Sequence, residues 1–361
     1  MKKKIKIFLF NPYPAIGGVD NTIKSFFSNT SNDFEIEYLS LKKNTFFKNK
    51  RIKNTVIKAS STFSSFFKIY KIFKNDKSDL KIFISFQYFA NIWSILFIKI
   101  LLQGKLFIYE VNHLDELNYY DNFNEYIKKI IIKFSIKFLY KYPDIVGSNS
   151  KELSQDLNSY IGRKVHTIYN PCFNKVKIRK EKYKKKSKIK ILSISRFVKQ
   201  KDHITLLKSI NKSKFKDKIF LDLVGYGKEY FKIKNFIKKN KIKAKIHLNK
   251  TKIDNFYKKA DLYICTSLYE GLPTTLIEAA SYCLPIISSN FKSGSKEIFK
   301  HGRAGYLFNV GDHVYLSRLI DQFITKPKLF YSKERICRKN LFRFSQKKNT
   351  NLLFKLIKSL I

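Results

Sequence analysis

The chain has 361 residues and carries 73 Lys+Arg against 27 Asp+Glu, which gives a formal net charge of +46. This length is too great for one ordinary core of about 150 residues, so we expect two domains. A hydrophobic content of 44% excludes global disorder, and 12 Gly and 7 Pro exclude collagen-like and Pro/Gly-rich chains. The charge favours anionic partners, which include nucleic acid, acidic lipid and phosphorylated small molecules.

The N-terminal segment resembles a signal peptide only superficially. Its apolar run, Ile5–Phe10, is interrupted by Lys6 and is followed by no small-residue cleavage site, so we do not expect secretion. The most apolar stretch, Ile82–Ile98, contains Gln87 and Asn91 and fits a buried strand and helix better than a membrane span. We therefore predict a cytoplasmic protein, with peripheral binding to the inner face of the cytoplasmic membrane as a hypothesis.

Short apolar runs alternate with helical patterns along most of the chain, which is typical of doubly wound α/β domains. Several runs are continuously apolar, as expected for parallel strands that are covered on both faces. The strands expected in the first half are Ile5–Phe10, Glu35–Leu39, Leu80–Phe86, Lys105–Tyr109, Ile145–Gly147 and Val165–Tyr169. Helical patterns between them include Thr22–Ser28 and Asn122–Tyr140.

A strongly basic run, Lys175–Lys190, has few large apolar residues and predicts a solvated linker. The alternation then resumes with expected strands Ile189–Ile194, Ile219–Val224, Lys245–Leu248, Leu262–Cys265 and Pro285–Ser288, and with helices His203–Ile210 and Thr275–Tyr282. We predict Rossmann-like domains at residues 1–171 and 189–329, joined by a basic linker at 172–188. A final helical segment, from about residue 330 to 361, is expected to pack back on the first domain.

The cysteines and histidines give no sign of a metal site. No C-x-x-C pair occurs, and we expect buried reduced thiols at Cys172, Cys265, Cys283 and Cys337. No metal-ligand spacing relates these cysteines to the histidines at positions 166, 203, 247, 301 and 313.

The densest chemical signal lies between Leu262 and Ser288, where a buried strand leads through a loop into a helix. The loop holds Glu270 and Gly271, and Pro273 suits the first turn of the helix because its missing N–H would have no partner there. The loop follows the carboxyl end of a strand, which is where open α/β sheets bind ligands.

The helix start adds a second feature of a binding site. Main-chain N–H groups at Thr274 and Thr275 are placed to hold phosphate oxygens, and Glu278 follows one turn later. Two carboxylates beside an anion site suit sugar or ribose hydroxyls. The alternative, from these residues alone, is a surface loop before a helix whose N-terminal acid is favoured by the helix dipole.

This segment resembles the E-x7-E motif of the retaining family 4 glycosyltransferases, with Glu270 and Glu278 as its two acids. The resemblance extends over residues 17–310 in the family's order, and one departure is Ser195 at a position where the family has glycine. The other matching elements are the double glycine Gly17-Gly18, the Asn-Pro at Asn170-Pro171, the G-R-x4-K-like Ser195–Lys201, the G-x-G turn Gly225–Gly227, and Ser293–Ile298 followed by Gly302 and Gly305–Leu307.

The resemblance implies the GT-B fold, an α/β fold with two Rossmann-like domains that face each other across a cleft. The first domain would bind the acceptor and the second the nucleotide-sugar donor. Arg196 and Lys201 would hold the donor diphosphate, Glu270 would contact the transferred sugar, and Glu278 the ribose. Main-chain groups at Gly17, Gly18, Gly271, Thr274 and Thr275 would approach the diphosphate or the acceptor. Considered alone, two basic residues in so basic a chain indicate only a solvated face.

His113 is the candidate catalytic residue of the first domain, because it lies just after an expected strand and because some members of the family have a histidine there. Glu110, in the same loop, is the rival candidate. A histidine in such a loop is often structural, and the residues alone do not decide between the two.

The resemblance implies sugar transfer with retention from a nucleotide diphosphate sugar, expected to be a UDP-sugar, to a saccharide that is expected to be lipid-linked. The product would belong to a cell-surface polysaccharide such as a capsule or lipopolysaccharide. No Asp-x-Asp triplet occurs, so we expect no metal and no other cofactor. The alternatives are a UDP-sugar 2-epimerase on the same fold and, outside the enzymes, a basic nucleic-acid-binding protein. No nucleic-acid-binding motif supports the latter.

One helix pattern, Glu125–Tyr142, repeats lysine at positions 129, 133, 137 and 141. An apolar side is predicted from Ile130, Ile131, Phe134, Phe138 and Leu139. A basic amphipathic helix of this kind can lie on anionic lipid. The alternative is a crossover helix that packs on the core and exposes its lysines to solvent.

Overall fold

The computed structural model describes residues 4–14, 18–28, 33–42, 52–177, 187–250 and 252–361. The chain forms two compact units, of which the first comprises residues 1–172 and 346–361 and the second residues 173–345. Each unit has its own parallel sheet and its own hydrophobic core.

The sheet of the first unit has seven strands in the described residues, in the order β3-β2-β1-β4-β5-β6-β7. Its central strand, β1 (Ile5–Phe10), pairs in parallel with β2 and β4. Ile7 and Leu9 belong to one buried cluster and Phe8 and Phe10 to another, as the alternation of a strand that is covered on both faces requires. The remaining strands are β2 (Phe34–Ser40), β3 (Ile52–Val56), β4 (Leu80–Phe86), β5 (Lys105–Glu110), β6 (Ile145–Ser148) and β7 (His166–Thr167).

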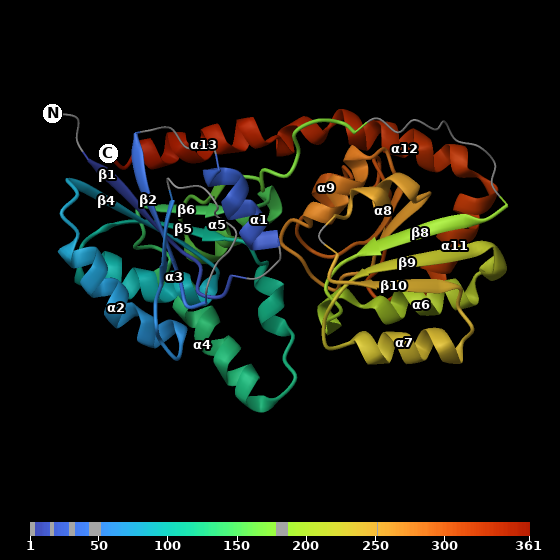
Figure 1. The fold of residues 1–361 in the computed structure, drawn as a ribbon, viewed down its shortest axis with the longest axis horizontal. Helices are drawn as coiled ribbons and strands as arrows, with labels where there is room; N and C mark the ends of the chain where they lie inside the picture. The colour runs from blue at the N-terminus through green and yellow to red at the C-terminus, as the bar shows by residue number, and fades with distance from the viewer. Residues whose placement is uncertain (1–3, 15–17, 29–32, 43–51, 178–186, 251) are drawn as a thin grey trace. The chain divides into compact units, whose positions relative to one another are not determined.

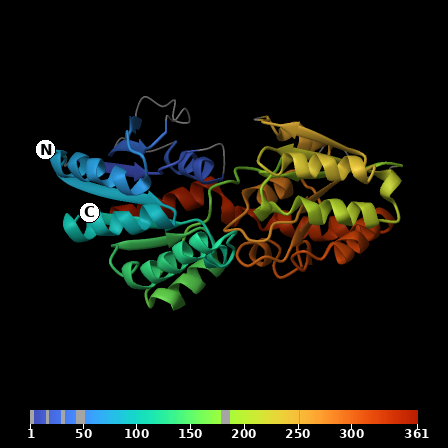
Figure 2. The same cartoon turned by 90° about the horizontal axis from the view of Figure 1, so that it is seen from below.

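Helices cover both faces of this sheet (Figure 1). α1 (Gly18–Phe27) and α13 (Gln346–Lys358) lie side by side on the face of Ile7 and Leu9. The view from below brings α2 and α3 of the opposite face to the front (Figure 2). The helices of that face are α2 (Thr62–Asn75), α3 (Tyr88–Ser94) with its π-helical continuation Ile95–Leu101, α4 (Phe123–Leu139) and α5 (Lys151–Ile161).

The sheet of the second unit has the strand order β10-β9-β8-β11-β12-β13 and is likewise parallel in its described residues. Its strands are β8 (Ile189–Ile194), β9 (Ile219–Gly225), β10 (Ala244–Leu248), β11 (Leu262–Cys265), β12 (Ile286–Ser289) and β13 (Tyr306–Phe308). Its helices are α6 (His203–Lys212), α7 (Tyr230–Lys239), α8 (Asp254–Lys259), α9 (Thr274–Ser281), α10 (Ser295–Ile298), α11 (His313–Thr325) and α12 (Pro327–Lys339).

Several predicted elements differ from the structure. β3 and β13 were not predicted, because β3 exposes most of its side chains at a sheet edge and β13 is only three residues long. The predicted strand Val165–Tyr169 contracts to β7. The cysteines are not all buried: Cys265 and Cys337 are, whereas Cys172 and Cys283 are half-buried.

The domain bounds differ from the prediction at the C-terminal end. Residues 330–345 stay with the second unit, and only 346–361 join the first. The reason is the packing of α12, which places Phe330 in the core of the second unit, whereas Leu353 and Ile357 of α13 lie in the core of the first. Residues 178–186 of the predicted basic linker lie outside the described residues.

None of the helices in the described residues is long and apolar enough to cross a membrane. The apolar stretch Ile82–Ile98 forms β4, α3 and the start of the π-helical turn, and its side chains Ile82, Ile84 and Ile95 are buried in the first unit.

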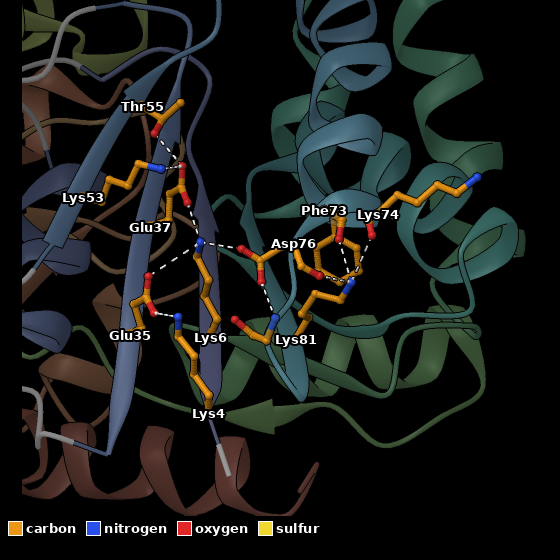
Figure 3. Close-up of polar contacts among 11 residues, drawn as sticks. Lys4, Lys6, Glu35, Glu37, Lys53, Thr55, Phe73, Lys74, Asp76 and Lys81 are labelled. Carbon is orange, nitrogen blue, oxygen red and sulfur yellow. Dashed lines mark hydrogen bonds and ion pairs between the residues drawn. The ribbon is translucent and has the colours of Figure 1, made fainter. Parts of the chain in front are cut away.

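A buried lysine at the start of β1 forms ion pairs that connect neighbouring segments of the first unit (Figure 3). Lys6 Nζ, whose side chain is 7% exposed, contacts Glu37 at 2.8 Å and Asp76 at 2.6 Å. Glu37 also accepts a hydrogen bond from Thr55 at 2.6 Å. Burial opposes the charged forms, but the contacts with Lys6 prevail and hold the pKa of Asp76 down at about 2 and that of Glu37 below its ordinary value. The lysine that broke the apolar run in the sequence is therefore compensated by acids from β2 and from the turn before β4.

Candidate functional site

The predicted donor-site residues of the second unit follow two neighbouring strands, β8 and β11. Arg196 and Lys201 come after β8, and Glu270 comes after β11. The strand order reverses between these two strands, since β8 leads to β9 on one side whereas β11 leads to β12 on the other. Open parallel sheets bind ligands at such a switch point, beyond the carboxyl ends of the strands.

The G-x-G turn after β9 supports the Arg196 loop. A Cβ at Gly225 would lie 1.9 Å from the Ser195 carbonyl oxygen, and one at Gly227, with φ +147°, would lie 2.4 Å from that of Phe197. The main chains meet through hydrogen bonds from Ser195 N–H to Val224 O at 3.0 Å and from Phe197 N–H to Tyr226 O at 2.6 Å. The two glycines are therefore required for close packing of the loop that carries Arg196.

Lys201 and Glu270 meet at the site. Lys201 Nζ forms an ion pair with Glu270 Oε1, and the two side chains are 12% and 14% exposed. Ser267 Oγ donates to the same carboxylate oxygen at 2.8 Å. The guanidinium of Arg196 is exposed and lies 3.4 Å from Gln200 Oε1. The motif spacing thus brings a cation and a carboxylate from distant segments into direct contact.

The loop around Gly271 is fixed by the Ser293–Gly294 turn. Ser293 Oγ donates to the Gly271 carbonyl oxygen at 3.0 Å. Gly294 has φ +90°, and a Cβ there would approach that same oxygen to 2.7 Å. The predicted glycine-containing ending of the motif therefore packs against the Glu270–Gly271 loop rather than forming a separate feature.

α9 begins at Thr274, directly after this loop, and no side chain caps its N-terminus. An uncapped helix start presents main-chain N–H groups and the positive end of the helix dipole. The Glu270 loop, Lys201 and this helix start together form a site that can hold an anion beside a carboxylate. Such a site suits a phosphorylated sugar.

Glu278 lies in the body of α9 and is half-buried. Its Oε2 accepts a hydrogen bond from the Tyr257 hydroxyl at 2.9 Å. Burial raises the pKa of Glu278, whereas the bond from Tyr257 and the charge of Lys177 act in the opposite direction. Tyr257, Lys177 and Ser267 could not be predicted as site residues, because only contact in space, and no spacing in the chain, relates them to the motif.

The departure at Ser195 has a partner, His203, that the motif spacing does not indicate. Ser195 Oγ lies 2.9 Å from His203 Nε2, and burial, together with the nearby charge of Lys201, lowers the pKa of His203 to about 3. The imidazole is therefore neutral and can hold the serine hydroxyl beside the Arg196 loop.

The candidates of the first unit follow β1 and β5. Gly17 lies outside the described residues, and Gly18 opens α1. Glu110 is fully buried and accepts hydrogen bonds from Tyr140 at 2.9 Å and Asn91 at 3.2 Å. Burial raises the pKa of Glu110 to about 8.

Both ring nitrogens of His113 are engaged by neighbouring groups. Its Nδ1 accepts from Asp115 N–H at 3.1 Å, which leaves the proton on Nε2, 2.9 Å from Asp156 Oδ2. The side chain is 2% exposed. These contacts give His113 and Glu110 structural partners, and their catalytic roles stay predictions.

In the described residues, no group of three or more His, Cys, Asp or Glu side chains is arranged to hold a metal ion. Lys201, Arg196 and the start of α9 are positive groups that the site offers to an anion.

Comparison with known proteins relates the segment that carries this site to one family model. Residues 174–343 match the family model described as glycosyl transferases group 1. The amylovoran biosynthesis glycosyltransferase AmsD of Erwinia amylovora is 32% identical over 145 residues, which are 39% of this chain and 40% of AmsD. A Campylobacter jejuni protein, named as a GalNAc-alpha-(1->4)-GalNAc-alpha-(1->3)-diNAcBac-PP-undecaprenol alpha-1,4-N-acetyl-D-galactosaminyltransferase, is 27% identical over 73% of this chain and 70% of its own length.

Solved structures share the fold of the whole chain. The Anabaena protein HepE in complex with UDP and glucose superposes with a TM-score of 0.80 and 15% identity, over 99% of this chain and 100% of HepE. Sucrose-phosphate synthase from Thermosynechococcus elongatus gives a TM-score of 0.78 over 99% of both chains, with 13% identity. The predicted α/β class with two Rossmann-like units, as in the GT-B glycosyltransferases, is confirmed. The match over residues 174–343 covers nearly all of the second unit, which resembles the group 1 glycosyl transferases.

Proposed function

We propose that the chain is a retaining glycosyltransferase that moves a sugar from a nucleotide diphosphate sugar, taken to be a UDP-sugar, to a lipid-linked saccharide in cell-surface polysaccharide biosynthesis. The observation that carries the proposal is the meeting of Lys201 and Glu270 beside the uncapped start of α9. This places a cation, a carboxylate and main-chain N–H groups at the switch point of the sheet.

Each group has a role that its chemistry supports. As the bond to the nucleotide breaks, negative charge develops on the leaving diphosphate, and fixed cations stabilise it without reorganisation. Lys201 and Arg196 supply that charge, together with N–H groups at Gly271, Thr274 and Thr275. Lys201 is paired with Glu270 in the structure, so a bound donor would take over part of this pairing and leave Glu270 to accept from sugar hydroxyls.

The comparisons support the substrate classes. The Campylobacter jejuni relative is named for transfer to an undecaprenol-linked saccharide, and HepE was solved with UDP and glucose. AmsD is named for the biosynthesis of amylovoran. These names favour a nucleotide-sugar donor and a lipid-linked acceptor for this chain.

The same proposal includes contact with an anionic membrane through α4. Large apolar side chains follow one another along this helix in steps of three or four residues and stand in solvent, among them Phe123 at 72%, Ile131 at 58%, Phe134 at 59% and Phe138 at 54% exposure. Exposed lysines at positions 128, 137 and 141 accompany them.

Donor transfer is the direct test. The purified protein is screened with UDP-, GDP- and ADP-sugars by thermal shift, and transfer is then measured to a lipid-linked acceptor from a membrane extract, with and without EDTA. We expect one donor class to raise the melting temperature, acceptor-dependent transfer and no effect of EDTA. Conversion of the donor without acceptor would indicate an epimerase instead.

Lys201→Ala tests the donor site itself. We expect it to lower kcat/KM by about 100-fold while the fold is retained, since a fixed cation at the leaving group is lost. Lys199→Ala, an exposed change in the same loop, is the matched control and should retain transfer. Turnover like that of the wild type in Lys201→Ala would contradict the assigned site.

A further inference from the structure

An aromatic cluster lies behind Glu278 and holds the side chain of Tyr257 against its carboxylate. Tyr257 comes from α8, is 1% exposed and donates its hydroxyl to Glu278 Oε2 at 2.9 Å. Its ring stacks on that of Tyr282, with centroids 5.0 Å apart and planes at 13°. The ring of Tyr263 lies 5.9 Å away at 33°. Packing therefore fixes the direction in which the Tyr257 hydroxyl points.

Tyr282 is itself held by an ion pair. Its hydroxyl donates to Asp254 Oδ1 and accepts from Lys177 Nζ at 2.6 Å. Lys177 Nζ also contacts Asp254 at 3.1 Å, and the Lys177 main-chain N–H donates to the Ser281 carbonyl oxygen at 2.7 Å. The start of the basic segment is thus anchored to the end of α9. Contacts with Lys177 and Asp254 hold the stacked rings in place.

On the basis of the proposed function, we infer that Tyr257 is a positioning residue of the donor site. Its hydroxyl holds the Glu278 carboxylate in the orientation and the ionised form that accept hydrogen bonds from the ribose hydroxyls of the nucleotide. A carboxylate is an acceptor only, so it matches two donating hydroxyls, whereas a protonated acid would have to donate one bond itself.

The electrostatics agree with this role. Burial raises the pKa of Glu278, and the hydrogen bond from Tyr257 is the first of the effects that oppose the rise. Lys177 also lowers this pKa, whereas Asp254 raises it. Removal of the Tyr257 hydroxyl therefore lets the pKa of Glu278 rise further.

Three other ionisable groups on the elements packed around α9 form hydrogen bonds with groups other than Glu278. Tyr263 donates to the Ile194 carbonyl oxygen at 3.1 Å. Arg338 of α12 donates to Cys283 Sγ at 3.4 Å, and Arg343 of the short helix Leu341–Phe344 donates to the Ile298 carbonyl oxygen at 3.3 Å. Tyr257 is thus the neighbour whose removal acts directly on the Glu278 carboxylate.

Tyr257→Phe keeps the stacked ring and removes only the hydroxyl. We expect the donor KM to rise about tenfold at neutral pH, with kcat changed less than about twofold, because one hydrogen bond to a binding group is lost. The acidic limb of kcat/KM should also move to higher pH, because the pKa of Glu278 rises further without this hydrogen bond. A role in packing alone would not move this limb.

Tyr282→Phe is the matched control. It keeps the stack and removes a hydroxyl that bonds to Asp254 and Lys177, which stay paired with each other, so its KM and pH profile should match the wild type. In a Glu278→Gln background, Tyr257→Phe should add no further change in donor KM. A wild-type pH profile in Tyr257→Phe, or an equal shift in Tyr282→Phe, would overturn the inference.

Calorimetric binding of UDP, GDP and ADP separates this inference from the proposed function. A wild-type protein that binds one of these nucleotides but transfers no sugar contradicts the proposed transfer, and a tenfold weaker Kd for Tyr257→Phe then still supports the positioning role. A wild-type protein that binds none of them overturns both.

Discussion

Single residues of the same motif reach different partners. Glu270 pairs with Lys201 and Ser267, whereas Glu278 accepts from Tyr257. Their spacing in the chain places one acid in the loop and the other inside α9. Glu270 is therefore paired with a cation, whereas Glu278 is held by an uncharged hydrogen-bond donor.

Glu110 carries a prediction that depends on pH. Burial raises its pKa to about 8 in the folded protein, against an ordinary value of 4.5. Between these values the folded state keeps a proton that the unfolded state has released, so the stability falls as pH rises, by about 1.4 kcal/mol per pH unit from this group. Glu110→Gln mimics the protonated acid and should abolish this decline, so it should match the wild type near pH 4.5 and become increasingly more stable than the wild type as pH rises towards 8.

Urea unfolding of both proteins at pH values from about 6 to about 9 measures this difference. The same variant also tests whether Glu110, the rival of His113, is the catalytic residue of the first unit. If Glu110→Gln retains transfer, Glu110 has a structural role; a wild-type free energy of unfolding that is flat over this pH range would contradict the protonated state.

Among the elements, α4 shows that packing decides which of its apolar side chains are exposed to solvent. Of the predicted apolar side, Ile131, Phe134 and Phe138 are exposed, whereas Ile130 and Leu139 are half-buried in the first unit. Phe123 and Ile127 are exposed as well. Lys129 and Lys133 bond back to residues 116–119, whereas Lys128, Lys137 and Lys141 are exposed.

We expect the protein to float with anionic liposomes and to be released by about 0.5 M salt, because surface cations lose their attraction within a short Debye length. Phe134→Asp combined with Phe138→Asp should abolish flotation, since apolar insertion is lost. Phe231→Asp, at a 71% exposed site on α7, is the control and should leave it unchanged. Equal flotation of all three proteins would remove α4 from the membrane contact.

The Lys6 cluster concerns the sheet of the first unit. Lys6→Met should lower the free energy of unfolding by about 3 kcal/mol, because Glu37 and Asp76 lose their buried partner. Lys4→Met removes a pair with Glu35 on a side chain that is 64% exposed, and should cost about 0.5 kcal/mol or less.

The lowered pKa of Asp76 determines how the effect of Lys6→Met on stability should change with pH. The pKa of Asp76 is lowered to about 2 in the folded protein, so its contribution is present above the unfolded value near 3.8 and is lost as pH falls towards 2. The difference between Lys6→Met and the wild type should therefore shrink in acid. A constant difference from pH 7 to the acid limit would show that lost packing, rather than the charge, is responsible.

At the scale of the whole molecule, the net charge of +46 acts on the folded chain by self-repulsion. Raising sodium chloride from about 20 mM to about 300 mM should increase the melting temperature by several degrees, because exposed lysines are screened while the buried Lys6 cluster is screened little. Differential scanning calorimetry in sodium and in potassium chloride measures the effect. A melting temperature that falls with both salts would show that attractive ion pairs prevail over repulsion.

Much of the fold could be predicted from local patterns. Largely apolar runs indicated β1, β4, β8 and β11, because a strand covered on both faces must be mostly apolar on both. The edge strand β3 escaped prediction, since its exposed side chains leave no such pattern. The tail was divided wrongly because helical periodicity shows that a face is buried without showing which core buries it.

The sequence by itself indicated that the chain is α/β, that it has two Rossmann-like units, and that one segment of the second resembles the E-x7-E motif of the family 4 glycosyltransferases. These properties depend on local hydrophobic periodicity and on residue order. Only the tertiary structure decided that Lys201 meets Glu270, that Tyr257 and Lys177 stand behind Glu278, and which face of α4 is exposed. Such contacts join segments far apart in the chain, and the packing of helices on each sheet, rather than any local pattern, brings them together.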